Sequence, residues 1–397
     1  MKKLKVLFVT VGILMLAYLL LLISPYKYLI KGVGSTYLKG EKSAHYTDWV
    51  DFDIRTIENE PSQVYRSIKA ENNASLNPKL DEMLKKTNSG SYLVFRNDSL
   101  VSEHYFNGIQ DSSRTNSFSM AKTITTLLTQ IAIQDKIVGS WDDLVIKYVP
   151  WIKGKYANEL TLRHLSTMTA GLDWDEGYAS PFGITAKAYY SSDIEGVMRT
   201  VDVINKPGEK FQYQSGSTQL LGFVLQSALN QYKDAQGKQV FANVSEFAEA
   251  KLWKRIGAEY SAYWSLDKEN GKELTYCCVD ATAKDFGKLG LLVLHHGKNF
   301  KGESIVDSSF LALAQRPFRS ENYGHSFWLG EIGGIKFSYF QGLGGQYIVL
   351  PKDKENMVVV RTGNGIDKGN GFPVFDCVKT YTWFARNPQT PINPEMK

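Results

Sequence analysis

The stretch that decides the fold of this chain reads Ser119-Met120-Ala121-Lys122. It opens an apolar pattern of about four turns, which predicts a buried helix that ends near Gly139. Residues three apart share a helix face, so the Lys122 amine is expected to reach the Ser119 hydroxyl. A free serine is a poor nucleophile and needs such a neighbouring base. The Ser-x-x-Lys spacing alone is common in proteins. A serine that caps the helix, followed by an exposed lysine without a catalytic role, would have the same sequence.

Strand-like runs flank this helix on both sides. Before it, runs at 92–96 and 100–106 around Asn97-Asp98 predict a β-hairpin. After it, short runs between turn residues predict strands at 326–331, 335–340, 346–350 and 356–361, and then a closing helix at 372–386. We therefore expect an α+β fold, in which one antiparallel sheet is built from the N- and C-terminal segments and flanked by helices.

The stretch between the two groups of strands has mainly helical patterns. Helices are expected at 161–168, 219–229, 244–253 and 284–294. Strand signals are scarce between these helices, which predicts an inserted all-helical lobe at about 140–295 within a globular domain at 78–390. A cleft between the lobe and the sheet is the natural place for a site.

The N-terminal segment differs from the rest. Residues 6–23 form an apolar run at the lower edge of the length that spans a bilayer, and no small-residue cleavage pattern follows it. We expect a membrane anchor or signal segment at 1–25, with membrane contact through residues 4–23, and favour an uncleaved anchor. Lysines on both sides leave its orientation weakly set. Residues 26–77 show no sustained period and are predicted to be a stalk and lead-in segment.

The composition argues against several classes of function. A net charge of +5 is scattered along the chain, so no basic stripe for nucleic acid exists. Cys277, Cys278 and Cys377 suit neither a disulfide framework nor a Cys-x-x-Cys metal site, and we interpret them as buried thiols. The sequence has no His-x-x-x-His or comparable cluster, so neither a metal nor another cofactor is expected.

A second chemical element is the stretch Tyr213-Gln214-Ser215, which follows a Pro-Gly turn and precedes a helical run. This order places Tyr213 at the tip of a loop. A phenol titrates near a pH of about 10, so Tyr213 would act as a base only if a cation such as Lys122 favoured the phenolate. The alternative is a tyrosine packed by its ring with a solvated hydroxyl.

The third element is the glycine-rich stretch from Phe340 to Gly345, between two predicted strands. Glycines let a backbone pass close to a ligand and offer an N–H group to an oxyanion. A helix N-terminus at Ser119 offers another such group. A simple hairpin turn is the alternative explanation of these glycines.

These three elements, in this order, resemble the serine β-lactamase and penicillin-binding protein superfamily. They are most similar to its branch of 6-aminohexanoate-dimer hydrolases and class C-like esterases. Further stretches that share the resemblance lie at 141–150, 161–174 and 280–287. The resemblance covers roughly residues 90–385 and implies a β-lactamase-like fold and a serine hydrolase activity on a small ester or amide.

The resemblance also implies roles for particular residues. It makes Ser119 the acylated nucleophile, Lys122 its activating partner and Tyr213 the proton shuttle to the leaving group. Ser215 takes the supporting third place of the family's Tyr-x-Ser motif. The oxyanion would lie between the backbone N–H groups of Ser119 and Leu343, and the register of the second stays open by one or two residues.

One difference from the family's sequence pattern narrows the range of expected substrates. β-Lactamases and DD-peptidases carry Lys-Thr-Gly on the C-terminal strand, where the lysine holds the substrate carboxylate, but this chain has Phe340-Gln341-Gly342. An unpaired carboxylate in a partly desolvated cleft is costly, so β-lactams and D-Ala-D-Ala ends are disfavoured and an ester or linear amide is expected. The residues expected to line the substrate cleft are Trp174, Glu176, Tyr178, Phe340 and Gly342.

Three other interpretations stay open. A Ser-His-Asp triad with His164, His295 or His325 as base has no Gly-x-Ser-x-Gly elbow to support it. A non-catalytic, membrane-tethered binding or sensing module would keep the fold without the chemistry. The third is a penicillin-interacting peptidase or β-lactamase. For the hydrolase, the resemblance implies an exported enzyme with its body outside the cytoplasm, in the periplasm or at the cell surface.

Overall fold

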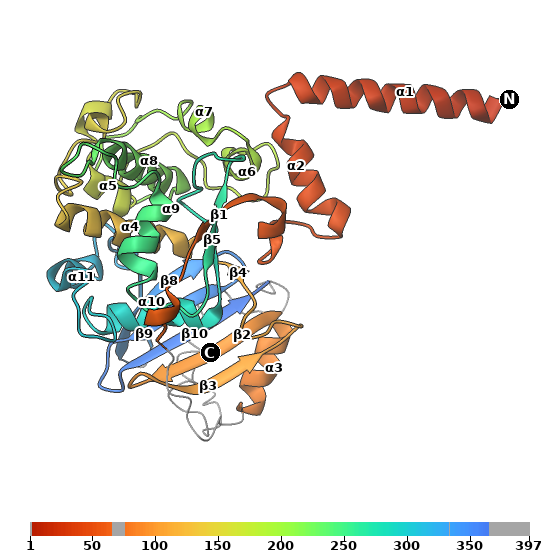
Figure 1. Ribbon diagram of the computed structural model, residues 1–397. Coiled ribbons are helices and arrows are strands. Elements are labelled where there is room, and N and C mark those ends of the chain that lie inside the picture. The colour runs from red at the N-terminus through yellow and green to blue at the C-terminus, as the bar shows by residue number, and fades with distance from the viewer. Residues whose placement is uncertain (1, 66–75, 333, 365–397) are drawn as a thin grey trace.

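The computed structural model describes residues 2–65, 76–332 and 334–364. Two antiparallel sheets and the helices around them form the body, from which the N-terminal helix α1 (Lys2–Ile23) projects (Figure 1). The closing helix expected at 372–386 lies outside the described residues, as does Cys377.

The larger sheet joins strands from the beginning and the end of the body. Its order is β3-β2-β10-β9-β8-β7. The strands are β2 (Ser89–Arg96), β3 (Ser99–Tyr105), β7 (Trp328–Ile332), β8 (Ile335–Gly342), β9 (Gln346–Pro351) and β10 (Met357–Gly363). Because β2 pairs antiparallel with β10, the expected α+β fold with a sheet from both ends of the sequence is confirmed. The predicted hairpin turns through Asn97 and Asp98, whose φ values of 46° and 65° match a two-residue turn between twisted strands.

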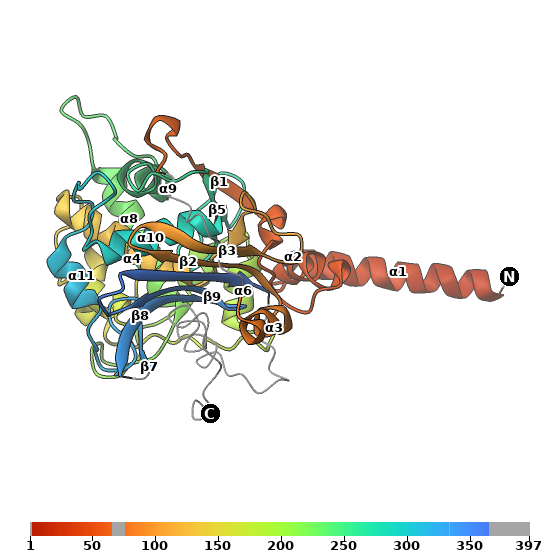
Figure 2. The ribbon, with the colours of Figure 1, turned by 90° about the horizontal axis from the view of Figure 1, so that it is seen from below.

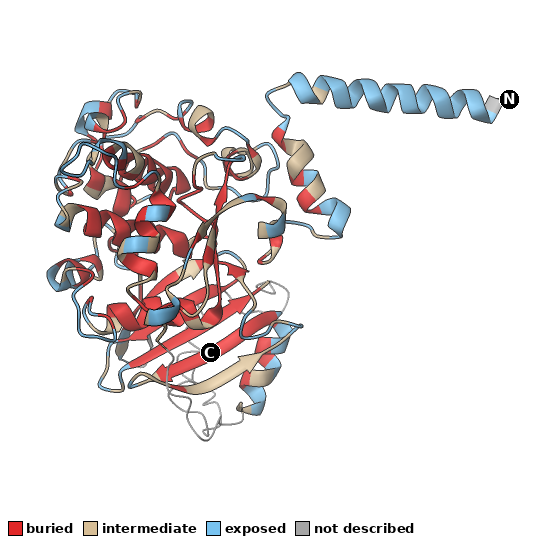
Figure 3. Ribbon diagram, viewed as in Figure 1, coloured by how far each residue is buried: buried red, intermediate tan, exposed pale blue. Residues whose placement is uncertain are grey.

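Helices cover both faces of the larger sheet. Side chains alternate along a strand, so neighbouring residues enter different cores. Leu93 of β2 belongs to the main core with residues of α10 (Ala283–Leu294). Val94, the next residue, belongs to a second cluster with residues of α3 (Pro78–Lys86). Figure 2 shows α10 and α3 on opposite sides of the sheet, and Figure 3 shows its strands largely buried between them.

The helical lobe fills the middle of the chain. Its helices are α5 (Leu162–Ser166), α6 (Ile184–Tyr190), α7 (Ile194–Met198), α8 (Ser215–Gln231) and α9 (Val244–Ala248); α4 (Met120–Gln134) precedes the lobe, and α11 (Ser308–Ala314) follows α10. The central helix α4 contacts α8 and the strand β8, so it lies between lobe and sheet. It ends at Gln134 rather than near Gly139, because Lys136 takes a positive φ of 58° that breaks the helical path.

A second, smaller sheet is a feature that the sequence patterns did not predict. Its order is β1-β5-β6-β4. The strands are β1 (Asp53–Ile57), β4 (Thr115–Asn116), β5 (Ala262–Leu266) and β6 (Val279–Ala281). β1 comes from the segment expected to be a stalk, and β5 and β6 come from the stretch expected to be all-helical. β4 has two residues and β6 three, which are too few for an alternating pattern to stand out.

The segment after α1 also packs on the body. Its helix α2 (Tyr28–Ser35) contacts α6, and the Tyr28 hydroxyl donates a hydrogen bond to the Pro181 carbonyl at 3.0 Å. A Cβ at Gly32 would lie 3.1 Å from the Tyr190 ring, so glycine allows this close approach. α1 itself is exposed, and its stretch Lys3–Ile23, with a mean hydropathy of 2.9, is long and apolar enough to cross a membrane.

Candidate active site

Ser119 lies at the start of α4, where a strained residue turns the chain into the helix. Phe118 has a φ of 42°, in the left-handed region that residues other than glycine seldom adopt. Its side chain is buried, and its N–H donates to Asn116 Oδ1 at 2.8 Å, so the surroundings hold this conformation. Backbone strain of this kind gathers at functional sites.

Lys122 lies one turn further along α4 and is buried, with 1% of its surface exposed. Its Nζ donates to Ser119 Oγ at 2.9 Å and to the Tyr276 carbonyl at 2.9 Å. Burial lowers the pKa of Lys122 to about 8, and the negative charge of Glu176 limits the fall. A large share of this amine is therefore neutral at mildly alkaline pH and is able to accept a proton from Ser119.

Three threonines on α4 fix the helix that carries this pair. Thr123 Oγ1 donates to the Ser326 carbonyl at 2.6 Å, and Thr126 Oγ1 donates to Ser326 Oγ at 2.7 Å. Thr125 Oγ1 donates to the Thr275 carbonyl at 2.7 Å. Thr275 is the neighbour of Tyr276, whose carbonyl accepts a hydrogen bond from Lys122. The threonine bonds therefore fix the position of the Lys122 amine relative to this carbonyl.

Tyr213 also lies beside Lys122, whose Nζ is 5.1 Å from the centre of the phenol ring. Burial and the nearby hydroxyl of Tyr178 raise the pKa of Tyr213 well above its usual value, although a hydrogen bond with Ser119 acts in the opposite direction. The phenolate that a base role would need is therefore disfavoured. A protonated Tyr213 retains its hydrogen for donation to a leaving group.

Glu176 ties the loop before α6 to the start of α8. Its carboxylate accepts bonds from the N–H of Ser215 at 2.6 Å and from Ser215 Oγ at 2.5 Å. Trp174 Nε1 donates to it at 2.6 Å, and the Tyr178 hydroxyl donates at 2.5 Å. A carboxylate at the N-terminus of a helix is favourably placed. Glu176 thus holds Ser215 and Tyr178 in place.

The turn between β8 and β9 brings a second backbone N–H group near Ser119. Gly342 passes so close that a Cβ there would lie 2.1 Å from the Ser117 carbonyl oxygen. Leu343 follows in the turn. Within the part of the chain that the structure describes, the N–H groups of Ser119 and Leu343 donate to no protein acceptor. Both are available to bind a developing oxyanion.

A buried arginine holds this turn. Arg361 is 1% exposed, and its guanidinium donates to the carbonyls of Gly344 at 2.6 Å and Gly345 at 2.7 Å. Gln346 Nε2 donates to the Leu343 carbonyl at 3.0 Å. The conformation of the turn is therefore fixed before any ligand binds.

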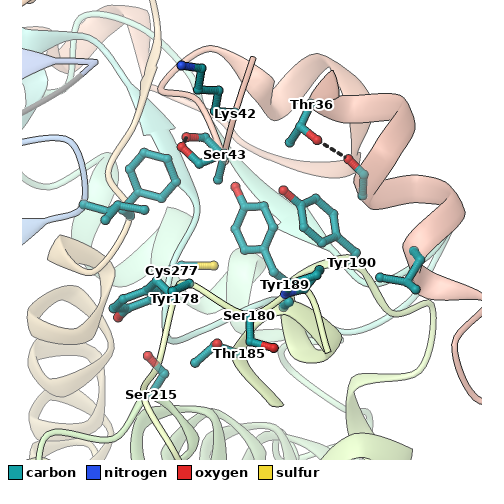
Figure 4. Close-up of a pocket in the computed structure, with 18 of the residues that line it drawn as sticks. Thr36, Lys42, Ser43, Tyr178, Ser180, Thr185, Tyr189, Tyr190, Ser215 and Cys277 are labelled. Carbon is teal, nitrogen blue, oxygen red and sulfur yellow. Dashed lines mark hydrogen bonds between the residues drawn. The ribbon is translucent and has the colours of Figure 1, made fainter. Parts of the chain in front are cut away.

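A cavity of about 200 Å³ opens beside Ser119 (Figure 4). Ser119, Leu343, Ser215 and Tyr178 line it, so four of the residues singled out in the sequence meet there. Tyr178 and Ser215 lie at one end of the cavity, and Tyr189 lies across from them in Figure 4.

Other residues expected to line the cleft do not border this cavity. Phe340 is fully buried and packs edge-on against Phe327, with ring centres 5.3 Å apart. Trp174 is 3% exposed and belongs to the core. Glu176 acts through Ser215 and Tyr178, and Gly342 contributes a close backbone approach rather than a cavity wall. Burial by distant segments of the chain decides these placements, and local sequence does not show it.

The three histidines considered for a Ser-His-Asp triad form hydrogen bonds with residues other than Ser119. His164 Nδ1 accepts the N–H of Thr161 in a capping box, and His295 Nε2 lies 2.6 Å from Asp98 Oδ1. His325 Nδ1 lies 2.9 Å from Ser166 Oγ, and burial lowers the pKa of His325 to about 4. None of the three lines the cavity at Ser119.

Several residues at the site were not found from the sequence. The Tyr276 carbonyl that binds Lys122 is a backbone group without a sequence signal. Cys277 and Cys278 are buried but form a disulfide with each other, which corrects the interpretation of free thiols, and Cys277 lines the cavity. Bonds between adjacent cysteines are unusual, so their adjacency had argued against a bridge. Residues of α2 also line the cavity, although no motif marks them.

The family model described as Beta-lactamase matches residues 76–368. The 6-aminohexanoate-dimer hydrolase of Paenarthrobacter ureafaciens is 21% identical over 315 residues, which cover 71% of this chain and 74% of that protein.

Solved structures share the fold. One, provisionally assigned as a 6-aminohexanoate-dimer hydrolase from Bacillus anthracis, has a TM-score of 0.72 at 22% identity and covers 92% of this chain and 95% of its own. A penicillin-binding protein from Bacillus halodurans has a TM-score of 0.58 at 15% identity and covers 77% of this chain and 99% of its own. Since the matched family model spans more than half of the 397 residues, the chain belongs to the Beta-lactamase family.

Proposed function

We propose that this protein is a serine hydrolase that cleaves an ester or a linear amide through an acyl-enzyme on Ser119. The observation that carries the proposal is the buried Lys122 amine, 2.9 Å from Ser119 Oγ and with its pKa lowered to about 8. A structural lysine gains nothing from burial without a carboxylate partner, whereas a general base needs this lowered pKa.

The proposed reaction has two halves. Ser119 Oγ attacks the substrate carbonyl carbon while neutral Lys122 takes the hydroxyl proton, and the N–H groups of Ser119 and Leu343 bind the oxyanion. Tyr213 donates its proton to the leaving alcohol or amine and recovers one from Lys122. Water then attacks the acyl-enzyme, its proton passes to the Lys122 and Tyr213 pair, and the carboxylic acid leaves as Ser119 regains its hydrogen.

Esters and linear amides are proposed because the carboxylate anchor of the antibiotic-binding relatives is absent. Phe340 stands where those proteins have the lysine of Lys-Thr-Gly, and its side chain is buried in the core. A penicillin carboxylate would meet no cation from this strand position. Rapid, stable acylation by a fluorescent penicillin would contradict this preference.

A serine-directed fluorophosphonate tests the proposed activity. The wild-type protein is expected to gain one covalent label, and Ser119→Ala is expected to gain none. Ser309→Ala removes an exposed serine on α11 and serves as the matched control that keeps the label. Absence of labelling in the wild type, or equal labelling in Ser119→Ala, would favour a non-catalytic binding module on the same fold.

The pH dependence follows from the pKa of Lys122. The reactive form is the neutral amine, so kcat/KM for a neutral ester is expected to rise with pH through an inflection at about 8. Glu176 raises the pKa of Lys122, so Glu176→Gln is expected to move that inflection to lower pH, while the exposed Glu321→Gln leaves it in place. Initial rates across the pH range measure both; a profile that falls with rising pH would contradict the role of Lys122.

We also propose that residues 4–23 of α1 anchor the protein in a membrane, with the body on the extracytoplasmic side. The support is the length and apolar character of α1, none of which is buried against the body. A reporter that is active only in the cytoplasm, fused to the C-terminus of the full chain, is expected to stay inactive. Full activity of that fusion would contradict the orientation.

A further inference from the structure

The cavity beside Ser119 extends away from the catalytic residues and reaches the N-terminal segment. One of its walls is a face of α2 made by Leu29, Gly32 and Val33, which share a helix face, and it is continued by Thr36, the residue that follows the helix. The facing wall comes from α6 and the loop before it, with Ala179, Pro181, Ala186, Tyr189 and Tyr190. Figure 4 shows Thr36 at the end of α2 across the space from Tyr189 and Tyr190.

The lining is almost free of charge. Lys42 is the single charged side chain among the described residues that line the cavity, and it is exposed. No carboxylate of the described chain borders it. Cys277 contributes a disulfide sulfur, which is apolar and does not ionise. A cationic group would lose its hydration in such a cavity without gaining a carboxylate partner, and the hydroxyl groups of the lining offer it only neutral acceptors. A hydrocarbon chain has no charge to desolvate and would gain from burial against the apolar side chains.

The position of the cavity relative to the catalytic groups shows which part of a substrate it would hold. Ser119 and Leu343, which would bind the carbonyl group, both line the cavity. Tyr213, which would donate to the leaving group, does not line it. The leaving group is therefore expected on the side of Tyr213, and the acyl part of the substrate is expected in the cavity.

Part of the cavity lining is exposed, and its α2 wall lies near the end of α1. Val33 is 43% exposed, Tyr37 65% and Tyr178 59%, although all three side chains line the cavity. Val33 and Tyr37 leave the α2 side of the cavity partly open to solvent, and exposed apolar side chains of this kind indicate a binding surface. Only the short turn after Ile23 separates α1 from Tyr28, the first residue of α2. An apolar chain held by the same membrane as α1 would thus start close to this opening.

We propose that the cavity binds the long, unbranched acyl chain of a lipid-like ester or amide, which enters past α2 and places its carbonyl carbon at Ser119. This proposal rests on the proposed serine hydrolase function and names its substrate class. It assigns α2 and the residues that follow it to substrate selection, a role that the sequence did not indicate.

Esters of p-nitrophenol with acetate, butyrate, octanoate and dodecanoate test the proposal, because they share one leaving group and differ only in the acyl chain. The full-length protein is assayed in one detergent throughout. We expect kcat/KM to rise at least about tenfold from acetate to octanoate, since each buried methylene favours binding in the transition state. Partition into micelles is the same for every variant, so it cancels when variants are compared at one chain length.

Two variants fill the cavity from opposite walls. Val33→Trp on α2 and Ala186→Phe on α6 are each expected to lower the octanoate-to-acetate ratio of kcat/KM at least about fivefold, because they remove space for the chain. Gly34→Trp is the matched control on α2: Gly34 does not line the cavity, and a Cβ there meets nothing within 4 Å. Its ratio is expected to equal that of the wild type.

The outcomes separate the two proposals. If no ester is hydrolysed in a Ser119-dependent way, the proposed hydrolase function fails. If Ser119-dependent hydrolysis occurs but acetate is turned over as well as octanoate, the acyl-chain proposal alone is overturned. Equal loss of the ratio in Val33→Trp and Gly34→Trp, with no loss in Ala186→Phe, would also overturn it, because the effect would then come from disturbance of α2.

Discussion

Replacing Lys122 by alanine is expected to lower kcat/KM for ester hydrolysis by about a thousandfold, the typical contribution of a positioned general base. Lys122 Nζ lies 2.9 Å from Ser119 Oγ, and burial has already brought its pKa to about 8. Without the amine, the serine hydroxyl would have to lose its proton to water. Steady-state rates on an ester and on a linear amide measure the loss.

Two further variants sharpen this prediction. Lys122→Arg keeps a positive charge but is not expected to restore activity, because a guanidinium does not release its proton in this pH range. The double variant of Ser119→Ala and Lys122→Ala is expected to be no slower than Ser119→Ala alone, since residues that act as one unit are not additive. A Lys122→Ala protein that keeps more than about a tenth of the wild-type rate would contradict a general base contribution of this size.

The second large effect is expected from Gly342→Ala, with a loss of about a hundredfold in kcat, the size seen when one oxyanion donor is removed. The added Cβ would lie 2.1 Å from the Ser117 carbonyl oxygen, so β8 must move away from the segment that leads into Ser119. That movement carries the Leu343 N–H with it. Because the N–H acts on the transition state, kcat is expected to fall more than KM rises.

A matched glycine controls for the substitution itself. Gly34→Ala adds a Cβ that meets nothing within 4 Å, and its kcat is expected to stay at the wild-type value. Thermal unfolding of both variants shows whether the fold is retained. A folded Gly342→Ala protein with wild-type kcat would contradict the placement of the oxyanion at this turn.

Local patterns predicted most of the fold. The hairpin at Asn97 and Asp98, the strands after residue 326 and the helix that starts at Ser119 each show their own period and their own turn residues. Two strands of the smaller sheet were missed because β4 spans only Thr115–Asn116 and β6 only Val279–Ala281. Strands this short exist because distant segments pair with them, and no single window of sequence contains that information.

The sequence likewise predicted only those features of the candidate site that depend on local structure. Ser119 and Lys122 were singled out because their spacing on one helix brings them together regardless of the rest of the chain. Phe340 was expected at the cleft, but packing against Phe327 places it in the core. The wall formed by α2 lies far from Ser119 in sequence, so only the folded chain reveals it. Tertiary contacts decide which nearby side chains face the cavity.

The acyl-enzyme itself gives the most direct test of the central claim. The wild-type protein is mixed with an ester, quenched in acid within the first turnovers, digested and analysed by mass spectrometry. We predict that the acyl group is found on the peptide that contains Ser119, on Ser119 itself, and that it disappears on longer incubation without the quench. An acyl group on another residue, or ester turnover that is unchanged in Ser119→Ala, would contradict the account.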